Sequence, residues 1–198
     1  MRKIGKGSCI RVGLGGVLMG LMASGCATSS DHAHFMSTPT SANIYVAPGN
    51  KHIQKVAIMP FKGPTELIGN SVSDMFVTES LRAGKYELVE RNQMAHVLGE
   101  AELALAGLSD SKAAHLGSMM GADAVIIGTV DEYGTSAQRG KTYPVVGITA
   151  RMIDAETGKI IWSVDLAKRA DSSATPLSQH ARAVVHEMMS ALYRKWLR

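Results

Sequence analysis

Histidine side chains are the first candidates for chemistry in this chain, because imidazole exchanges protons and binds metals near neutral pH. His96, His115, His180 and His186 fall on three predicted helices and form no cluster in the sequence. His180 and His186 are six positions apart, so their directions differ by about 120° around a helix. The chain also has no G-x-S-x-G elbow, no phosphate loop and no H-E-x-x-H zinc pair. The sequence therefore predicts no nucleophile, nucleotide or metal site.

Acidic side chains give no better catalytic pair. Asp131 and Glu132 are adjacent near the end of a predicted strand, and alternation along a strand directs such neighbours to opposite faces. Glu90, Arg91 and Glu100 are more suggestive, since Arg91 ends a predicted strand and Glu100 lies on the helix after it. We interpret them as structural, through an ion pair with another element or a preference of Glu90 for a helix N-terminus, with an interface role as the alternative. The sequence thus predicts no enzyme and no cofactor.

The stretch LMASGC, residues 21–26, predicts a lipid anchor. It ends an apolar segment, residues 12–23, that follows a basic start and is shorter than the ~20 residues of a membrane-spanning helix. LMASGC resembles the bacterial lipobox, which implies that Cys26 is acylated after cleavage of a signal peptide, residues 1–25. Ala23 stands where that motif favours Leu, so an ordinary secretion signal before a free cysteine is the alternative. By resemblance to enterobacterial sorting, Ala27 in place of Asp implies the outer membrane.

Removing the signal peptide changes the charge balance. The whole chain has 21 Lys and Arg against 17 Asp and Glu, and four of the basic residues lie in residues 1–25. The expected mature chain of 173 residues is therefore near neutral, which gives no support for binding nucleic acid. Cys9 leaves with the signal peptide and Cys26 carries lipid. No disulfide is then expected, and stability must come from packing.

The expected mature chain divides into a tether and one domain. Residues 26–54 are predicted to be the lipidated N-terminus and a flexible tether, because they contain Ser, Thr, Asn, Pro and Gly but little apolar periodicity. Within them NIYVA, residues 43–47, is either a short added strand or a segment that docks on a neighbour. The domain is predicted to span residues 55–198.

Apolar periodicity in the domain predicts the element order β-α-β-α-α-β-β-β-α. The last two strands form a hairpin around a turn at residues 154–159, where Gly158 takes positive φ. Helices alternate with strands first and a strand meander follows, which predicts an α/β or α+β domain with helices packed on a mixed sheet. Strands are expected at residues 55–61, 86–90, 123–133, 145–153 and 160–166, and helices at 65–82, 92–106, 110–120 and 175–196.

The order of several sequence pieces resembles the CsgG family, the curli-secretion lipoproteins of the outer membrane. The pieces are KVAIMPF, YELVERNQMAHVLGE, LGSMMGADAVIIGTV and ARMIDAETGKIIWSVD, within residues 55–167. The most specific feature is Glu90-Arg91 with Glu100 nine positions after the Arg, followed by the turn at Thr157 and Gly158. The resemblance implies a fold shared with the peptidoglycan-synthase activator LpoB and the N-terminal domain of TolB.

The chain departs from CsgG itself because it lacks the segments for two transmembrane hairpins. The first would fall between strands ending near Tyr133 and starting near Val145, and the second within residues 167–175. Neither gap has the length or alternation for two spanning strands of ~9–11 residues. We therefore expect a periplasmic module that serves assembly or secretion of surface structures through envelope protein contacts. The alternative is an LpoB-like activator of a penicillin-binding protein, and the sequence leaves open whether the chain forms a homo-oligomer.

Overall fold

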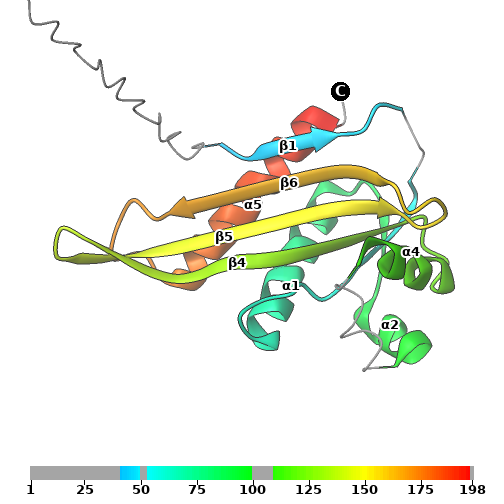
Figure 1. The fold of residues 1–198 in the computed structure, drawn as a ribbon, viewed down its shortest axis with the longest axis horizontal. Coiled ribbons are helices and arrows are strands. Elements are labelled where there is room, and N and C mark those ends of the chain that lie inside the picture. Colours follow the sequence, from blue (N-terminus) through cyan, green and yellow to red (C-terminus); the bar gives the residue numbers. More distant parts are fainter. Residues whose placement is uncertain (1–40, 50–52, 100–108, 197–198) are drawn as a thin grey trace, which may run out of the picture. The chain divides into compact units, whose positions relative to one another are not determined.

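Six strands form one mixed sheet in the order β1-β6-β5-β4-β2-β3 (Figure 1). The computed structural model describes residues 41–49, 53–99 and 109–196, all of which belong to one unit, Met36–Arg198. The strands β2 and β3 and the strands β2 and β4 pair in parallel, and the other neighbours are antiparallel. The mixed sheet with its packed helices confirms the predicted fold class. The strands are β1 (Asn43–Val46), β2 (Lys55–Ile58), β3 (Glu87–Val89), β4 (Ala124–Gln138), β5 (Lys141–Asp154) and β6 (Ile160–Arg169).

Local signals in the sequence fix the ends of the helices. The Thr65 hydroxyl accepts a hydrogen bond from the Ile68 N–H at 3.3 Å, and the Ser109 hydroxyl accepts one from the Lys112 N–H at 3.3 Å. These bonds satisfy backbone donors that the first helical turn leaves free. Gly84 ends its helix in the left-handed conformation, with φ of 60°. The helices are α1 (Glu66–Ala83), α2 (Arg91–Leu98), α4 (Asp110–Met119) and α5 (Leu177–Trp196).

The helices cover the two faces of the sheet unequally. On one face α1 and α5 pack on the larger core, in which Phe76, Trp162 and Met188 are fully buried. On the other face α2 and α4 cover Val125 and Ile153 with a smaller core. Figure 1 shows α4 and α2 at one end of this second face, which leaves the other end of β4, β5 and β6 without a described helix over it.

The strand NIYVA resolves an alternative that the sequence leaves open. Residues Asn43–Val46 form β1, which pairs antiparallel with β6 and extends the sheet. The added strand is therefore the correct choice, and the sheet begins before the domain start expected at residue 55. The Lys195 ammonium donates to the Ile44 carbonyl at 2.6 Å, so the last turn of α5 holds β1 against the sheet.

The two strands expected to end near Tyr133 and to start near Val145 are longer than predicted. β4 continues to Gln138 and β5 begins at Lys141, so the two strands form one long hairpin that extends past the end of β6 (Figure 1). Arg139 and Gly140 make its two-residue turn with φ of 50° and 74°, the double left-handed geometry that suits hairpins. Residues 135–142 are all exposed, so no buried face imposes the apolar alternation by which sequence reasoning finds strands.

A β-bulge overturns the expectation that Asp131 and Glu132 point to opposite faces. The β4–β5 register shifts between Val130 and Glu132, so Asp131 is an extra residue on β4. The Asp131 carboxylate accepts from the Thr149 hydroxyl at 2.8 Å, and the Glu132 Cβ lies 3.3 Å from where a Cβ on Gly147 would be. Positions 147 and 149 share one face of β5. The bulge therefore places both carboxylates on that face.

Gly69 provides a test of how closely α1 packs on the sheet. A Cβ at Gly69 would lie 1.9 Å from the Phe61 carbonyl oxygen, which belongs to backbone and cannot rotate away. Although alanine is favoured over glycine in a helix by about 1 kcal/mol, we expect Gly69→Ala to lower the free energy of unfolding by about 2–3 kcal/mol. Urea denaturation measures the change. Gly134→Ala, which meets no atom within 4 Å, is the control, and a stabilised Gly69→Ala would contradict the close approach.

Candidate functional site

A groove runs beside β3, the strand that ends the sheet. Its volume is about 530 Å³, and it lies between the second half of α1, the strand β3 and the start of α2. Within the described residues β3 pairs with a strand on one side only, because the strand order ends there. In a parallel pair, alternate residues of a strand bond to the neighbouring strand. In β3 the Glu87 N–H donates to the Gln54 carbonyl of the neighbouring segment at 2.7 Å. This edge groove is lined by Val77, Leu81, Leu88, Glu90, Arg91 and Met94, among others.

The edge groove contains two of the three charged residues singled out in the sequence. Glu90 is the N-cap of α2 and Arg91 is its first residue, and both side chains are exposed. The Glu90 side chain makes no capping hydrogen bond. Glu100 lies outside the described residues, so an ion pair that involves it stays a prediction. Leu81, 62% exposed, adds an apolar side chain beside these charges.

An aromatic cluster fixes the start of β3. The Tyr86 and Tyr193 hydroxyls are hydrogen-bonded, and the Tyr193 ring stacks on Trp196 with centroids 6.4 Å apart. Trp162 of β6 meets Trp196 edge-on at 6.3 Å. Burial raises the pKa of the Tyr86 phenol well above its ordinary value, and burial also raises the pKa of Tyr193. The cluster thus ties the edge groove to the last turns of α5 through groups that stay uncharged.

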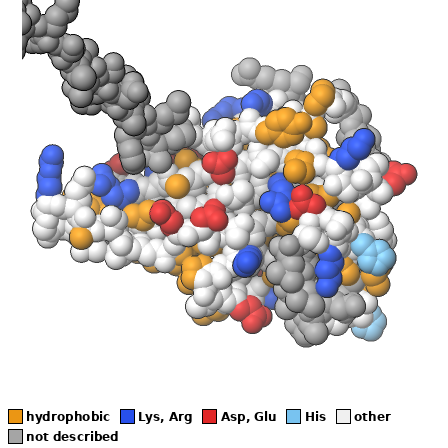
Figure 2. Space-filling view, in the orientation of Figure 1, with side chains coloured by type: hydrophobic (Ala, Val, Ile, Leu, Met, Phe, Trp, Pro, Cys, Tyr) orange, Lys and Arg blue, Asp and Glu red, His pale blue; other side chains and the backbone are white. Residues whose placement is uncertain are grey.

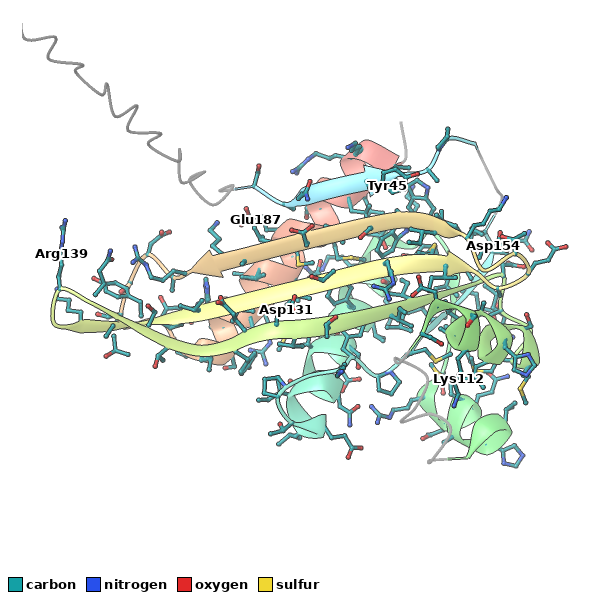
Figure 3. All side chains as sticks on the ribbon, in the orientation of Figure 1. Tyr45, Lys112, Asp131, Arg139, Asp154 and Glu187 are labelled. Atoms are coloured by element: carbon teal, nitrogen blue, oxygen red, sulfur yellow. The ribbon has the colours of Figure 1, made fainter. Side chains whose placement is uncertain are left out.

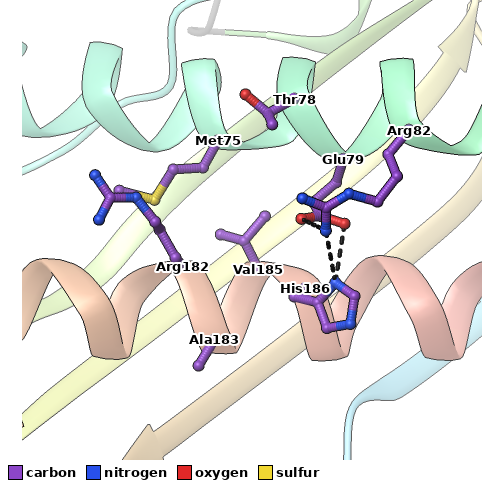
Figure 4. A pocket seen from close by; sticks show the side chains of 8 residues that line it. All are labelled: Met75, Thr78, Glu79, Arg82, Arg182, Ala183, Val185 and His186. Atoms are coloured by element: carbon purple, nitrogen blue, oxygen red, sulfur yellow. Dashed lines mark hydrogen bonds and ion pairs between the residues drawn. The ribbon is translucent and has the colours of Figure 1, made fainter.

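A second groove, of about 310 Å³, lies between α1 and α5 (Figure 4). At one end Glu79, whose side chain is 13% exposed, receives a hydrogen bond from Arg82 at 2.8 Å and lies 3.0 Å from His186 Nδ1. Figure 4 shows Arg182 at the other end beside Met75. The carboxylate therefore links the two helices through its contact with His186. Glu79, Arg82 and His186 bond to one another, so their polar groups serve to join α1 to α5.

The histidines do not assemble into a catalytic or metal site. His180 is buried and its Nε2 lies 2.8 Å from the Lys168 carbonyl oxygen, whereas His186 faces α1. Within residues 41–49, 53–99 and 109–196, no three His, Cys, Asp or Glu side chains converge as metal ligands. Of the two grooves, only the edge groove offers apolar surface, a strand edge and exposed charges together, a combination that suits binding of another macromolecule.

Sequence reasoning missed the junction formed by Glu79, Arg82 and His186. Glu79 and Arg82 are three positions apart on one helix face, a spacing that signals a local pair. The contact between Glu79 and His186 joins residues 107 positions apart, which no local pattern indicates.

None of the helices in the described ranges combines the length and apolar character needed to cross a bilayer.

Comparison with known proteins identifies the family. The family model of the curli production assembly/transport component CsgG matches residues 53–180, which include the whole sheet except β1 together with all helices up to the start of α5. The chain belongs to the CsgG family. The description of this family is that of a component of curli production, assembly and transport. No curated protein matches the chain in sequence.

Solved structures share the fold of this CsgG family member. PelC from Paraburkholderia phytofirmans, solved as a dodecamer, is 22% identical with a TM-score of 0.55 and covers 77% of this chain and 96% of its own. Lipoprotein GNA1162 from Neisseria meningitidis is 23% identical with a TM-score of 0.51, covering 67% and 95%. The LpoB C-terminal domain from Salmonella enterica is more distant, with a TM-score of 0.46 at 18% identity over 63% and 88%.

The buried tyrosines predict a loss of stability at alkaline pH. In the unfolded chain a phenol ionises near pH ~10, whereas the folded state holds Tyr86 neutral because burial raises its pKa. The unfolded state therefore loses the proton first, and the free energy of unfolding should fall as pH rises above about 10. Tyr86→Phe should flatten this slope and cost about 1 kcal/mol at neutral pH through the lost hydrogen bond. Urea midpoints at pH 8 and 10.5 measure it, with Tyr45→Phe as control; an unchanged slope in Tyr86→Phe would refute the assignment.

Proposed function

We propose that this protein is a non-catalytic lipoprotein at the periplasmic face of the outer membrane, which serves assembly or secretion of surface structures through protein contacts. The edge groove is the observation that carries the proposal. It combines an unpaired strand edge in the described sheet, apolar walls from Val77 and Leu81, and the charges of Glu90 and Arg91. An added peptide strand uses such an edge for backbone hydrogen bonds and such walls for its side chains.

The family and its structural relatives support parts of this role. The family description names an assembly and transport component. GNA1162 is a lipoprotein, which supports acylation at Cys26 of the lipobox-like sequence LMASGC. PelC is a dodecamer, which supports a homo-oligomer as the working state. In this proposal Glu90 and Arg91 act at the interface of the groove.

The lipid anchor is tested by changing Cys26 to Ser. Without the thiol no acyl chain is attached, so we expect the protein to move from the outer-membrane fraction to the soluble fraction. Cell fractionation with immunoblotting measures the distribution. Cys9→Ser is the matched control, because Cys9 lies in the predicted signal peptide and its change should leave the protein in the membrane fraction. Continued membrane retention of Cys26→Ser, with Cys9→Ser unchanged, would count against the anchor.

The edge groove is tested with a photo-crosslinking residue at Leu81 in living cells. We expect adducts with an envelope protein, identified by mass spectrometry, because Leu81 lies in the groove and is 62% exposed. The control is the same probe at Leu67, which is 78% exposed on the first turn of α1 and lies outside the groove. Adducts at Leu81 no more abundant than those at Leu67 would show that the groove is not the contact surface.

A further inference from the structure

Three carboxylates gather on the part of the sheet face that no described helix covers. Asp131 and Glu132 stand there because of the bulge, and Asp165 joins them because it pairs with Thr149, the residue that donates to Asp131. Figure 2 shows acidic side chains on this face of β4, β5 and β6, and Figure 3 labels Asp131. We call Asp131, Glu132 and Asp165 the acidic face.

The neighbours of the acidic face leave its charge largely uncompensated. The donors that meet these carboxylates are neutral: Thr149 for Asp131, and the Asn43 amide at 3.1 Å for Asp165. Two cations on the same face have other partners: Arg151 is paired with Asp110 at 2.5 Å, and Arg169 bonds to Gln138 and lies over Tyr143. Lys62 is exposed beside Thr129 and supplies one positive charge against three negative ones.

The surface around these carboxylates allows close approach. Gly147, Ser163, Thr149 and Ala167 occupy the face of β5 and β6 between them. Their side chains are small, although Gly147 itself is buried because the Glu132 side chain lies over it. An elongated polar segment therefore fits this face better than a bulky apolar one.

The tip of the β4–β5 hairpin carries the opposite charge. In residues 134–144 the only charged side chains are Arg139 and Lys141, and both are exposed. Arg169, the last residue of β6, lies at the base of the hairpin, where its guanidinium is 5.1 Å from the Tyr143 ring centroid and bonds to Gln138. Figure 3 shows Arg139 at the end of the projecting hairpin. We call Arg139 and Lys141 the basic tip.

The basic tip cannot neutralise the acidic face of its own chain. Lys141 pairs with Gln138, six positions after Glu132, and Arg139 is eight positions after Asp131, so about 20 Å or more of extended strand separates these charges. Charges so far apart are screened from each other at physiological salt. The hairpin continues the sheet and does not fold back over it (Figure 1).

We infer that the acidic face binds the basic tip of a second copy of this chain. This inference rests on the proposed homo-oligomer and names the surfaces that would build it. The two surfaces are opposite in charge, and the residues between the carboxylates, Gly147, Thr149 and Ala167, have small side chains. If two copies exchange tips the contact closes as a pair, and if each tip reaches a third copy the contact builds a ring.

Charge reversal in the detergent-purified, full-length protein tests the contact. The face variant carries Asp131→Lys and Glu132→Lys, and the tip variant carries Arg139→Glu and Lys141→Glu. We expect each alone to raise the dissociation constant for self-association on the order of 100-fold, because attraction becomes repulsion at two positions. An equimolar mixture should recover the oligomer, because a basic face then meets an acidic tip. Light scattering coupled to size exclusion measures the mass, and added salt should weaken the wild-type oligomer.

The matched control carries Glu66→Lys and Lys159→Glu, two exposed charges outside both surfaces. It should associate as the wild type does, and circular dichroism should show that every variant is folded. A wild-type protein that is monomeric at micromolar concentration, or face and tip variants with the wild-type mass, would overturn the inference. So would variants that dissociate but fail to recover in the mixture. Membrane retention through Cys26 and crosslinks at Leu81 do not depend on this contact, so its failure would be distinct from failure of the proposed anchor and groove.

Discussion

The antiparallel ladder between β4 and β5 runs from the pair Ala124–Asp154 to the pair Gln138–Lys141, and the other layers are built along it. At one end its two faces carry both cores, with Val125 and Ile153 on one side and Ile126 and Met152 on the other. At the other end the same backbone pairing continues without a buried face. The projecting end of the β4–β5 hairpin is therefore stabilised by hydrogen bonds between its strands and by the contact of Arg169 with the Tyr143 ring. Hydrophobic burial does not stabilise it.

Because helices cover this sheet unequally, some of its backbone and side-chain groups stay at the surface, where a partner can contact them. Buried backbone groups are almost always paired, whereas an edge strand such as β3 keeps donors and acceptors at the surface. The structure offsets that exposure by anchoring β3 through Tyr86 to the aromatic cluster of α5. Surfaces of this kind select partners by strand geometry and charge, in keeping with a family whose description is assembly and transport.

Charge on this molecule is arranged in two ways. Buried or helix-facing charges are paired across elements, as Glu79 with His186 and Lys168 with Glu187 at 2.7 Å. On the uncovered face and the hairpin tip, charges of one sign gather instead. Like charges placed together cost free energy unless solvent or a partner compensates them. The separation of acidic from basic side chains on this surface is therefore informative about contacts outside the chain.

The sequence by itself determined what depends on a few neighbouring residues: the order of the elements from β2 to α5, the caps at Thr65 and Ser109, and the turn closed by Gly158. It also indicated that Glu90 and Arg91 are notable, without indicating the groove they line. Only the tertiary structure decided that β1 joins the sheet, that the β4–β5 hairpin continues past Tyr133, and that Asp131 and Glu132 share a face. Those features depend on the register between strands and on contacts between segments distant in sequence. Apolar alternation in the sequence predicts a strand only where one face of that strand is buried, and it does not report register or long-range contacts.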